Sequence, residues 1–177
     1  MMFCQSGTTS RSPKRDSNSS CVAYFLTWTV YGTFLQGDNR HWWKRQKGSQ
    51  APTPYLCRWH RSRLKHPILL LDNGARDCVT DAITHHCNHR SWKLWACSVR
   101  SNHAHVVVTA CNVAPAIVRD QLKANGTGKL RRLQPTWIDR PVWTTKGWCD
   151  FIDTDDDLET VIEYTDVAQD RKARDIR

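Results

Sequence analysis

Residues Trp92–Thr109, WKLWACSVRSNHAHVVVT, contain two short apolar runs separated by a polar turn. The second run, Val106–Val108, consists of β-branched residues, which favour strands. Side chains alternate between the faces of a strand, so we expect His103 and His105 to share one face and Ala104 to lie on the other. Two imidazoles side by side on a rigid strand are the beginning of a divalent-metal site. The alternative is a pair of strand histidines that serve only as hydrogen-bonding groups.

The length and composition of the chain indicate one globular domain. Its 177 residues are enough to enclose a hydrophobic core. It has neither an apolar run long enough to span a bilayer nor an apolar secretory signal in residues 1–20, so we expect a cytoplasmic protein without a membrane partner. The eight cysteines form no CxxC pair, and we expect free thiols rather than disulfides.

The charge distribution favours a nucleic-acid partner. The net charge is +9 and the chain contains nine tryptophans, which offer phosphate contacts and faces for stacking unpaired bases. Residues 1–20 lack hydrophobic periodicity, and we expect a disordered basic tail there, a folded domain over 21–170 and a short basic tail over 171–177.

One internal stretch, residues 39–71, contains no acidic residue and interleaves basic with aromatic side chains. Glycine and prolines interrupt it, so we expect a long loop without a long helix or strand. Such a loop suits single-stranded nucleic acid, and the alternative is a merely solvated loop. The side chains that we expect to contact DNA, here and later in the chain, are Arg40, Lys44, Arg45, Lys47, Arg100, Lys123, Arg131 and Arg132.

Hydrophobic periodicity predicts the order of the remaining elements. We expect a strand at 21–30, a helix at 77–90, strands at 92–101 and 103–110, a helix from 115 interrupted at 125–128, a strand pair or bent strand within 141–152, and a final helix beginning at 153–157. This order predicts an α+β fold, a ferredoxin-like antiparallel sheet with flanking helices. The two histidines would lie on a central strand and Tyr164 on the closing helix.

This combination of groups indicates chemistry at phosphorus. A divalent metal held by His103 and His105 would polarise a phosphodiester while the hydroxyl of Tyr164 attacks it, giving a covalent phosphotyrosine. The alternative for Tyr164 is a half-buried aromatic side chain that only packs.

The chain resembles the single-tyrosine HUH transposases, in particular their REP-associated tyrosine transposase branch, over roughly residues 22–170. HUH denotes His, hydrophobic, His, which matches His103-Ala104-His105. The other matching segments, in the order of the family, are Thr27–Asp38, Gln121–Lys123, Val142–Gly147 and Val161–Tyr164.

The resemblance implies an HUH endonuclease fold, metal ligation by His103 and His105 and a nucleophilic Tyr164. It also implies an amide ligand about one turn after the tyrosine, where this chain has Ala168. Gln169 is the nearest amide, and on a regular helix it lies roughly 140° from the tyrosine. The helix must therefore be distorted for Gln169 to ligate, and Asp166 or Asp170 is the alternative.

The implied activity is that of a metal-dependent DNA-strand transferase, or transposase. It would use Mg²⁺ or Mn²⁺ to cleave and rejoin single-stranded or hairpin DNA through a 5′-phosphotyrosine, as a monomer or a homodimer. Two alternatives remain open at this stage. One is a non-catalytic nucleic-acid-binding protein descended from a transposase, and the other is a metal-dependent phosphodiesterase that uses water.

Overall fold

The computed structural model describes residues 22–40, 42–44, 47–110 and 112–168, apart from the side chains of residues 43, 167 and 168. The described chain divides into two compact units, one formed by residues 35–62 and the other by residues 22–34 together with 63–168. The histidine pair and Tyr164 belong to the second unit. The predicted tails lie outside the described residues.

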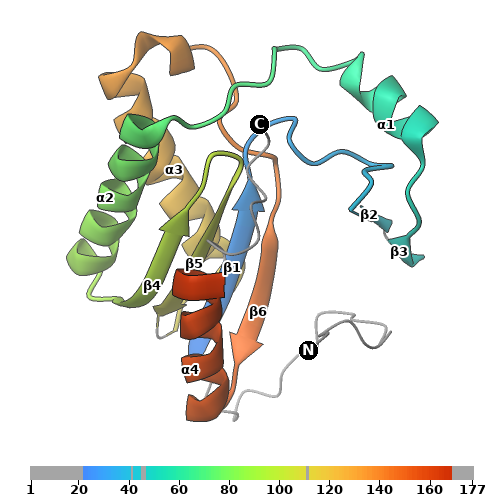
Figure 1. Ribbon diagram of the computed structural model, residues 1–177. Helices are drawn as coiled ribbons and strands as arrows, with labels where there is room; N and C mark the ends of the chain where they lie inside the picture. The colour runs from blue at the N-terminus through green and yellow to red at the C-terminus, as the bar shows by residue number, and fades with distance from the viewer. Residues whose placement is uncertain (1–21, 41, 45–46, 111, 169–177) are drawn as a thin grey trace. The chain divides into compact units, whose positions relative to one another are not determined.

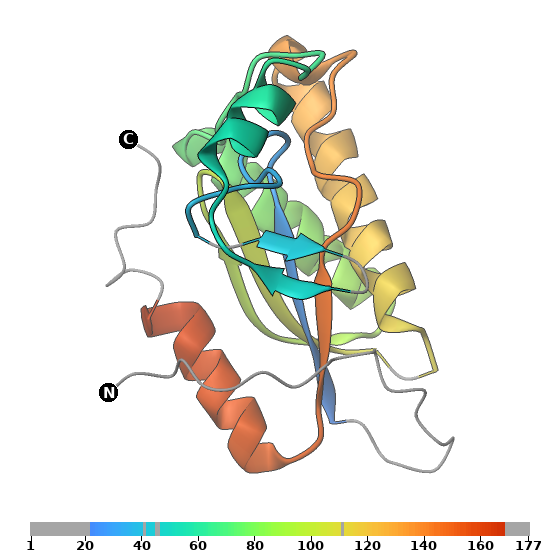
Figure 2. The same cartoon turned by 90° about the vertical axis from the view of Figure 1, so that its right-hand side faces the viewer.

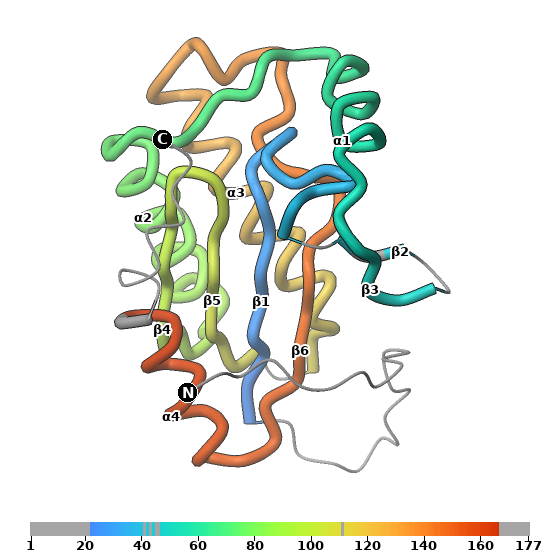
Figure 3. Tube along the Cα trace, turned by 45° about the vertical axis from the view of Figure 1, so that its right-hand side comes forward, coloured from blue at the N-terminus to red at the C-terminus, as the bar shows by residue number. Residues whose placement is uncertain are grey.

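The second unit is built on a four-stranded sheet in which every neighbouring pair is antiparallel. The spatial order is β4-β5-β1-β6, which Figure 3 shows from one face. The strands are β1 (Ala23–Thr29), β4 (Lys93–Val99), β5 (His103–Thr109) and β6 (Trp148–Ile152). The strand of the histidine pair is therefore a central one, as the sequence predicts.

Helices cover both faces of this sheet (Figures 1 and 2). Helices α2 (Asn73–His89) and α3 (Pro115–Leu133) pack on one face, and α4 (Asp155–Glu163) lies against the other. A short 3-10 helix, Pro135–Trp137, follows α3, and a π-helical turn, Tyr164–Ala168, continues α4. The β-α-β-β-α-β order of this unit is ferredoxin-like, which confirms the predicted α+β fold class.

The alternation of β5 assigns its side chains to two separate cores. Ala104, Val106 and Val108 join the core under α2 and α3, whereas Val107 joins the smaller core under α4 with Leu158. His103 and His105 share the face of Val107 because they differ from it by even numbers of residues. The histidines are thus on the side of the sheet that carries the closing helix.

Two helices differ from the sequence-based expectation. Helix α2 begins at Asn73 rather than near residue 77, because the carboxylate of Asp72 accepts a hydrogen bond from the Ala75 amide and caps it. Helix α3 runs without the predicted interruption at 125–128. Gly126 is buried against Val79 of α2, so the glycine allows two helices to approach closely instead of breaking one of them.

The expectation of a long loop at 39–71 was wrong in part. Residues 35–62 contain a two-stranded antiparallel sheet, β2 (Trp42–Lys44) with β3 (Gly48–Gln50), and the short helix α1 (Pro54–Arg61). The indole N–H of Trp42 donates to the Ala51 carbonyl. Each element is short, as the interrupting glycine and prolines predict.

The described cysteines, Cys57, Cys78, Cys87, Cys97 and Cys149, are free thiols, in agreement with the expectation. Burial raises the pKa of Cys87 to about 11 and that of Cys97 to about 12, so both are protonated at neutral pH. None of the helices in the described part of the chain combines the length and apolar content needed to cross a bilayer.

Candidate active site

The two histidine rings lie side by side on β5, with 4.8 Å between their centroids. His105 is 8% exposed, and His103 is partly exposed at the start of the strand. Thr27 and Thr29 of β1 lie directly opposite His105 and His103 in the antiparallel register. The predicted arrangement of the pair, on one face of a central strand, is therefore present.

Each imidazole is held through its Nδ1 atom by a side-chain oxygen. Nδ1 of His105 lies 2.8 Å from the hydroxyl of Thr27, and Nδ1 of His103 bonds the Oδ1 atom of Asn102. A carboxamide oxygen only accepts, so Nδ1 of His103 is the donor and a neutral ring carries its lone pair on Nε2. Metal-binding histidines commonly have their second nitrogen fixed in this way, so the donor set fits a divalent cation bound through the two Nε2 atoms.

Tyr164 lies on the same face of the sheet as the histidines. Its ring centroid is 6.0 Å from that of His105 and 6.2 Å from that of Phe25. Phe25 in turn stacks on His105 with 5.4 Å between centroids and an angle of 12° between the rings. Tyr164 is partly exposed, so the phenol packs without being enclosed.

The helix changes its winding at the tyrosine. Helix α4 is capped by Thr154, whose hydroxyl accepts from the amide of Asp157, and regular winding continues to Glu163. Residues Tyr164–Ala168 are π-helical, a rare conformation that occurs frequently at functional sites. A residue five positions after the tyrosine can act as a ligand only if the helix departs from regular α-helical winding. A π-helical turn is one such departure.

The predicted third ligand, Gln169, and the alternative Asp170 lie outside the described residues. Asp166, the other alternative, is exposed. Within the described ranges, no three or more His, Cys, Asp or Glu side chains gather in a group that could hold a metal ion.

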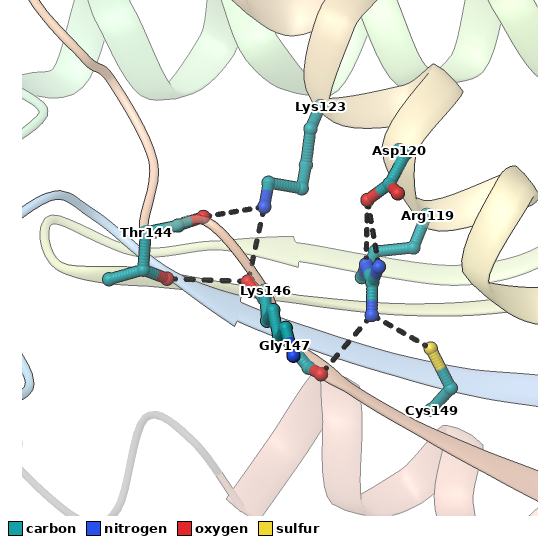
Figure 4. Close-up of polar contacts among 7 residues, drawn as sticks. All are labelled: Arg119, Asp120, Lys123, Thr144, Lys146, Gly147 and Cys149. Carbon is teal, nitrogen blue, oxygen red and sulfur yellow. Dashed lines mark hydrogen bonds and ion pairs between the residues drawn. The ribbon is translucent and has the colours of Figure 1, made fainter.

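Two buried cations of α3 fasten the segment that leads into β6 (Figure 4). The ammonium of Lys123 donates to the carbonyl oxygens of Thr144 at 2.6 Å and Lys146 at 3.1 Å. The guanidinium of Arg119 donates to the carbonyl of Gly147 at 3.2 Å. Both cations are 8% exposed, and burial lowers the pKa of Lys123 below its ordinary value, with the charge of Arg119 acting in the same direction.

Gly147 occupies the point where this segment meets the sheet. A Cβ atom there would lie 2.5 Å from the carbonyl oxygen of Thr27 and 3.0 Å from the Arg119 and Trp28 side chains. Only glycine allows this approach without displacement. Hydrogen bonds from α3 thus hold the segment. Because Gly147 has no side chain, the segment can also approach β1 closely.

The side chains predicted to contact DNA fall in both units, and their role stays a prediction. In residues 35–62, Arg40 is exposed but ion-paired with Asp38 at 2.7 Å, and Lys44 and Lys47 are exposed. Arg45 lies outside the described residues. In the same unit α1 exposes two aromatic rings, Tyr55 and Trp59, at 72% and 40%.

The remaining predicted contacts belong to the sheet unit. Arg132 is exposed, Arg131 donates to the carbonyls of Trp137 and Arg140, and Arg100 lies at the turn between β4 and β5. Lys123 is the buried cation described above, so its contacts are with the chain itself.

Sequence reasoning did not single out Thr27, Asn102 and Phe25 as parts of the site. Asn102 directly precedes His103 in the sequence, so its amide could have been recognised as a hydrogen-bonding group beside the pair. Thr27 and Phe25 are brought to His105 only by the register between β1 and β5, 78 residues apart in the case of Thr27.

Comparison with solved structures places the fold. No protein-family model and no curated protein matches the chain. Its structure is similar to that of a REP-associated tyrosine transposase bound to a REP hairpin, with a TM-score of 0.52, 11% identity and coverage of 90% of this chain and 74% of that one. The chain has the fold of a REP-associated tyrosine transposase.

A second similar structure is a proposed transposase from Deinococcus radiodurans R1, with a TM-score of 0.49, 13% identity and coverage of 86% of this chain and 94% of that one. The similarity to the REP-associated tyrosine transposase, at a TM-score of 0.52, confirms the predicted fold class at the level of architecture.

Proposed function

We propose that this protein is a metal-dependent DNA-strand transferase that cleaves and rejoins single-stranded DNA through a 5′-phosphotyrosine at Tyr164. The observation that carries the proposal is the convergence of Tyr164, His105 and His103 on one face of the sheet, with ring centroids 6.0 Å and 4.8 Å apart along that series. The three groups come from a rigid central strand and from the helix that closes the same face.

The histidine pair is assigned to metal binding because both Nδ1 atoms are held by oxygens. A bound Mg²⁺ or Mn²⁺ supplies Lewis-acid polarisation of a phosphate oxygen. Thr27 and Asn102 then orient the rings and keep the ligating nitrogens in place. Gln169 is the proposed third ligand, since it directly follows the π-helical turn at Tyr164–Ala168.

The chemical step is a transesterification. The hydroxyl oxygen of Tyr164 attacks phosphorus and loses its proton, the bond from phosphorus to the 3′ oxygen breaks, and that oxygen leaves as a 3′-hydroxyl. The product is a phosphodiester between Tyr164 and the 5′ end of the DNA. Attack by another 3′-hydroxyl on this linkage rejoins a strand and regenerates the tyrosine, so the sequence of steps needs no nucleoside triphosphate.

Single-stranded DNA with a hairpin is the proposed substrate. The structurally similar REP-associated transposase is bound to a REP hairpin, and the net charge of +9 suits a polyanion. Exposed Lys44, Lys47 and Arg132 are candidates for phosphate contacts, while Lys123 contributes through the segment before β6.

Covalent trapping tests the proposal. Purified protein is incubated with hairpin-bearing DNA labelled at its 3′ end and Mg²⁺ or Mn²⁺, and denaturing gel electrophoresis should reveal a labelled protein. Tyr164→Phe removes one oxygen and should abolish the adduct while retaining DNA binding. Tyr55→Phe, at a tyrosine that is 72% exposed, is the matched control and should form the adduct as wild type does.

The same assay separates the alternatives. Cleavage that survives Tyr164→Phe without an adduct would indicate a phosphodiesterase that uses water. If wild type and both variants bind DNA but none of them cleaves it with Mg²⁺ or with Mn²⁺, the protein is a non-catalytic nucleic-acid-binding protein.

A further inference from the structure

We propose that Trp148 is a stacking platform for an unpaired base of the DNA strand whose phosphate lies at the histidine pair. The inference rests on the proposed function and adds a base-binding subsite to it. Trp148 begins β6, and its side chain is 45% exposed. Nucleic-acid proteins use exposed aromatic rings of this kind to hold unpaired bases regardless of their sequence.

Strand register places Trp148 in line with the candidate active site. Thr27 of β1 lies directly opposite His105 on one side and directly opposite Trp148 on the other. Directly opposed residues in antiparallel strands point to the same face, so the three side chains form one row across the sheet. Two strand spacings separate the ends of this row, roughly 10 Å, which a short stretch of single-stranded DNA bridges.

The ring is held in a defined position. Its indole N–H donates to the carboxylate of Asp150 at 3.1 Å, which fixes the polar edge of the ring. The residue before it, Gly147, accepts a hydrogen bond from the Arg119 guanidinium at 3.2 Å, and a Cβ atom added to it would lie 2.5 Å from the Thr27 carbonyl oxygen. Such preorganisation reduces the entropy lost when a base binds.

The exposure of Trp148 is not required by the fold. On the other face of β6, Cys149 packs against the main core under α2 and α3. On the face of Trp148, Ile152 joins the core under α4. Trp148 belongs to neither core. A large apolar side chain on the strand beside the candidate active site, outside both cores, fits a ligand with an aromatic face.

A thermodynamic cycle tests the platform without any knowledge of the recognised sequence. Dissociation constants are measured for a single-stranded oligothymidylate and for an abasic strand of the same length, which keeps the phosphates and removes the bases. The full chain carrying Tyr164→Phe is used with Mg²⁺, so that the strand stays intact. The ratio of the two constants isolates the contribution of the bases, because phosphate contacts cancel.

Trp148→Ala should reduce this ratio about 5- to 150-fold, the effect expected for one stacked base. Its affinity for the abasic strand should stay unchanged, which also verifies that the variant is folded. Trp148→Phe should recover part of the ratio, because it retains a ring. Leu133→Ala, at an exposed apolar residue of α3, is the matched control and should leave the ratio unchanged.

A second measurement locates the contact directly. Ultraviolet irradiation of the complex with 5-iododeoxyuridine-substituted strand should crosslink the base to Trp148, the only tryptophan of the tryptic peptide 147–171. An unchanged ratio in Trp148→Ala overturns the inference, while adduct formation by wild type would leave the proposed function standing. Failure to bind either strand would overturn both.

Discussion

Replacing Lys123 by Met should destabilise the protein measurably, although it removes a buried charge. The substitution keeps a flexible apolar stem and removes the ammonium donor of two backbone carbonyls, those of Thr144 and Lys146. A buried acceptor left without its donor costs about 1–3 kcal/mol, and these two hydrogen bonds are part-buried. The variant no longer buries a cation near Arg119, which offsets part of that loss.

The expected net loss is about 2 kcal/mol, which corresponds to a decrease in Tm of about 4–8 °C for a domain of this size. Thermal unfolding followed by circular dichroism measures it. The control is Lys129→Met on the same helix, where the ammonium is partly exposed and lies 3.7 Å from Asp81, and the change should be below about 1 kcal/mol. Equal stability of the two variants would refute the idea that Lys123 fastens the segment before β6.

The pH dependence of stability provides a second test of the burial of Lys123. The pKa of Lys123 is lower in the folded chain than its ordinary value of 10.5, so below pH 10.5 the unfolded chain binds more protons than the folded one. Wild type should therefore gain stability relative to Lys123→Met as the pH rises towards 10.5. A constant difference across this range would contradict the assigned burial.

Other substitutions test other parts of the account. Gly147→Ala should destabilise the chain in urea unfolding because its Cβ would meet the Thr27 carbonyl at 2.5 Å. Gly128→Ala within α3 should stabilise the chain by about 0.5–1 kcal/mol, because its Cβ would make only an ordinary contact with the Arg132 side chain at 3.8 Å. A less stable Gly128→Ala than Gly147→Ala would contradict both expectations. Thr27→Val removes the hydroxyl that holds Nδ1 of His105 and should weaken Mn²⁺ binding about 10- to 100-fold in calorimetry, and unaltered binding would argue against metal ligation by this ring. Alanine replacement of four cations should flatten the dependence of DNA affinity on salt, and an unchanged slope would move the phosphate contacts elsewhere. These cations are Arg40, Lys44, Arg45 and Lys47.

The sequence predicts the histidine pair well because strand alternation is a local geometric rule. Once β5 is identified by its β-branched residues, the shared face of His103 and His105 follows without knowledge of the partner strands. The fold class follows from the order of strands and helices, which hydrophobic periodicity, likewise a local rule, predicts.

What sequence patterns missed depends on contacts between distant segments. Gly126 reads as a helix breaker, but in the fold it is a point of close packing against Val79. The sequence predicts Lys123 as a cation that contacts DNA, whereas in the fold it is buried and donates to the carbonyls of Thr144 and Lys146. The π-helical turn at Tyr164 likewise has no periodic signature, since a single turn contains too few residues to reveal a period.

Mass spectrometry of the trapped adduct identifies the residue that bonds to DNA, which we propose to be Tyr164. Trypsin releases residues 147–171 as one peptide, and Tyr164 is its only tyrosine. After nuclease digestion of the DNA, we expect this peptide to carry a nucleotide 5′-phosphate on Tyr164. A nucleotide on Tyr24, Tyr31 or Tyr55, or no modified peptide under conditions in which DNA is cleaved, would contradict it.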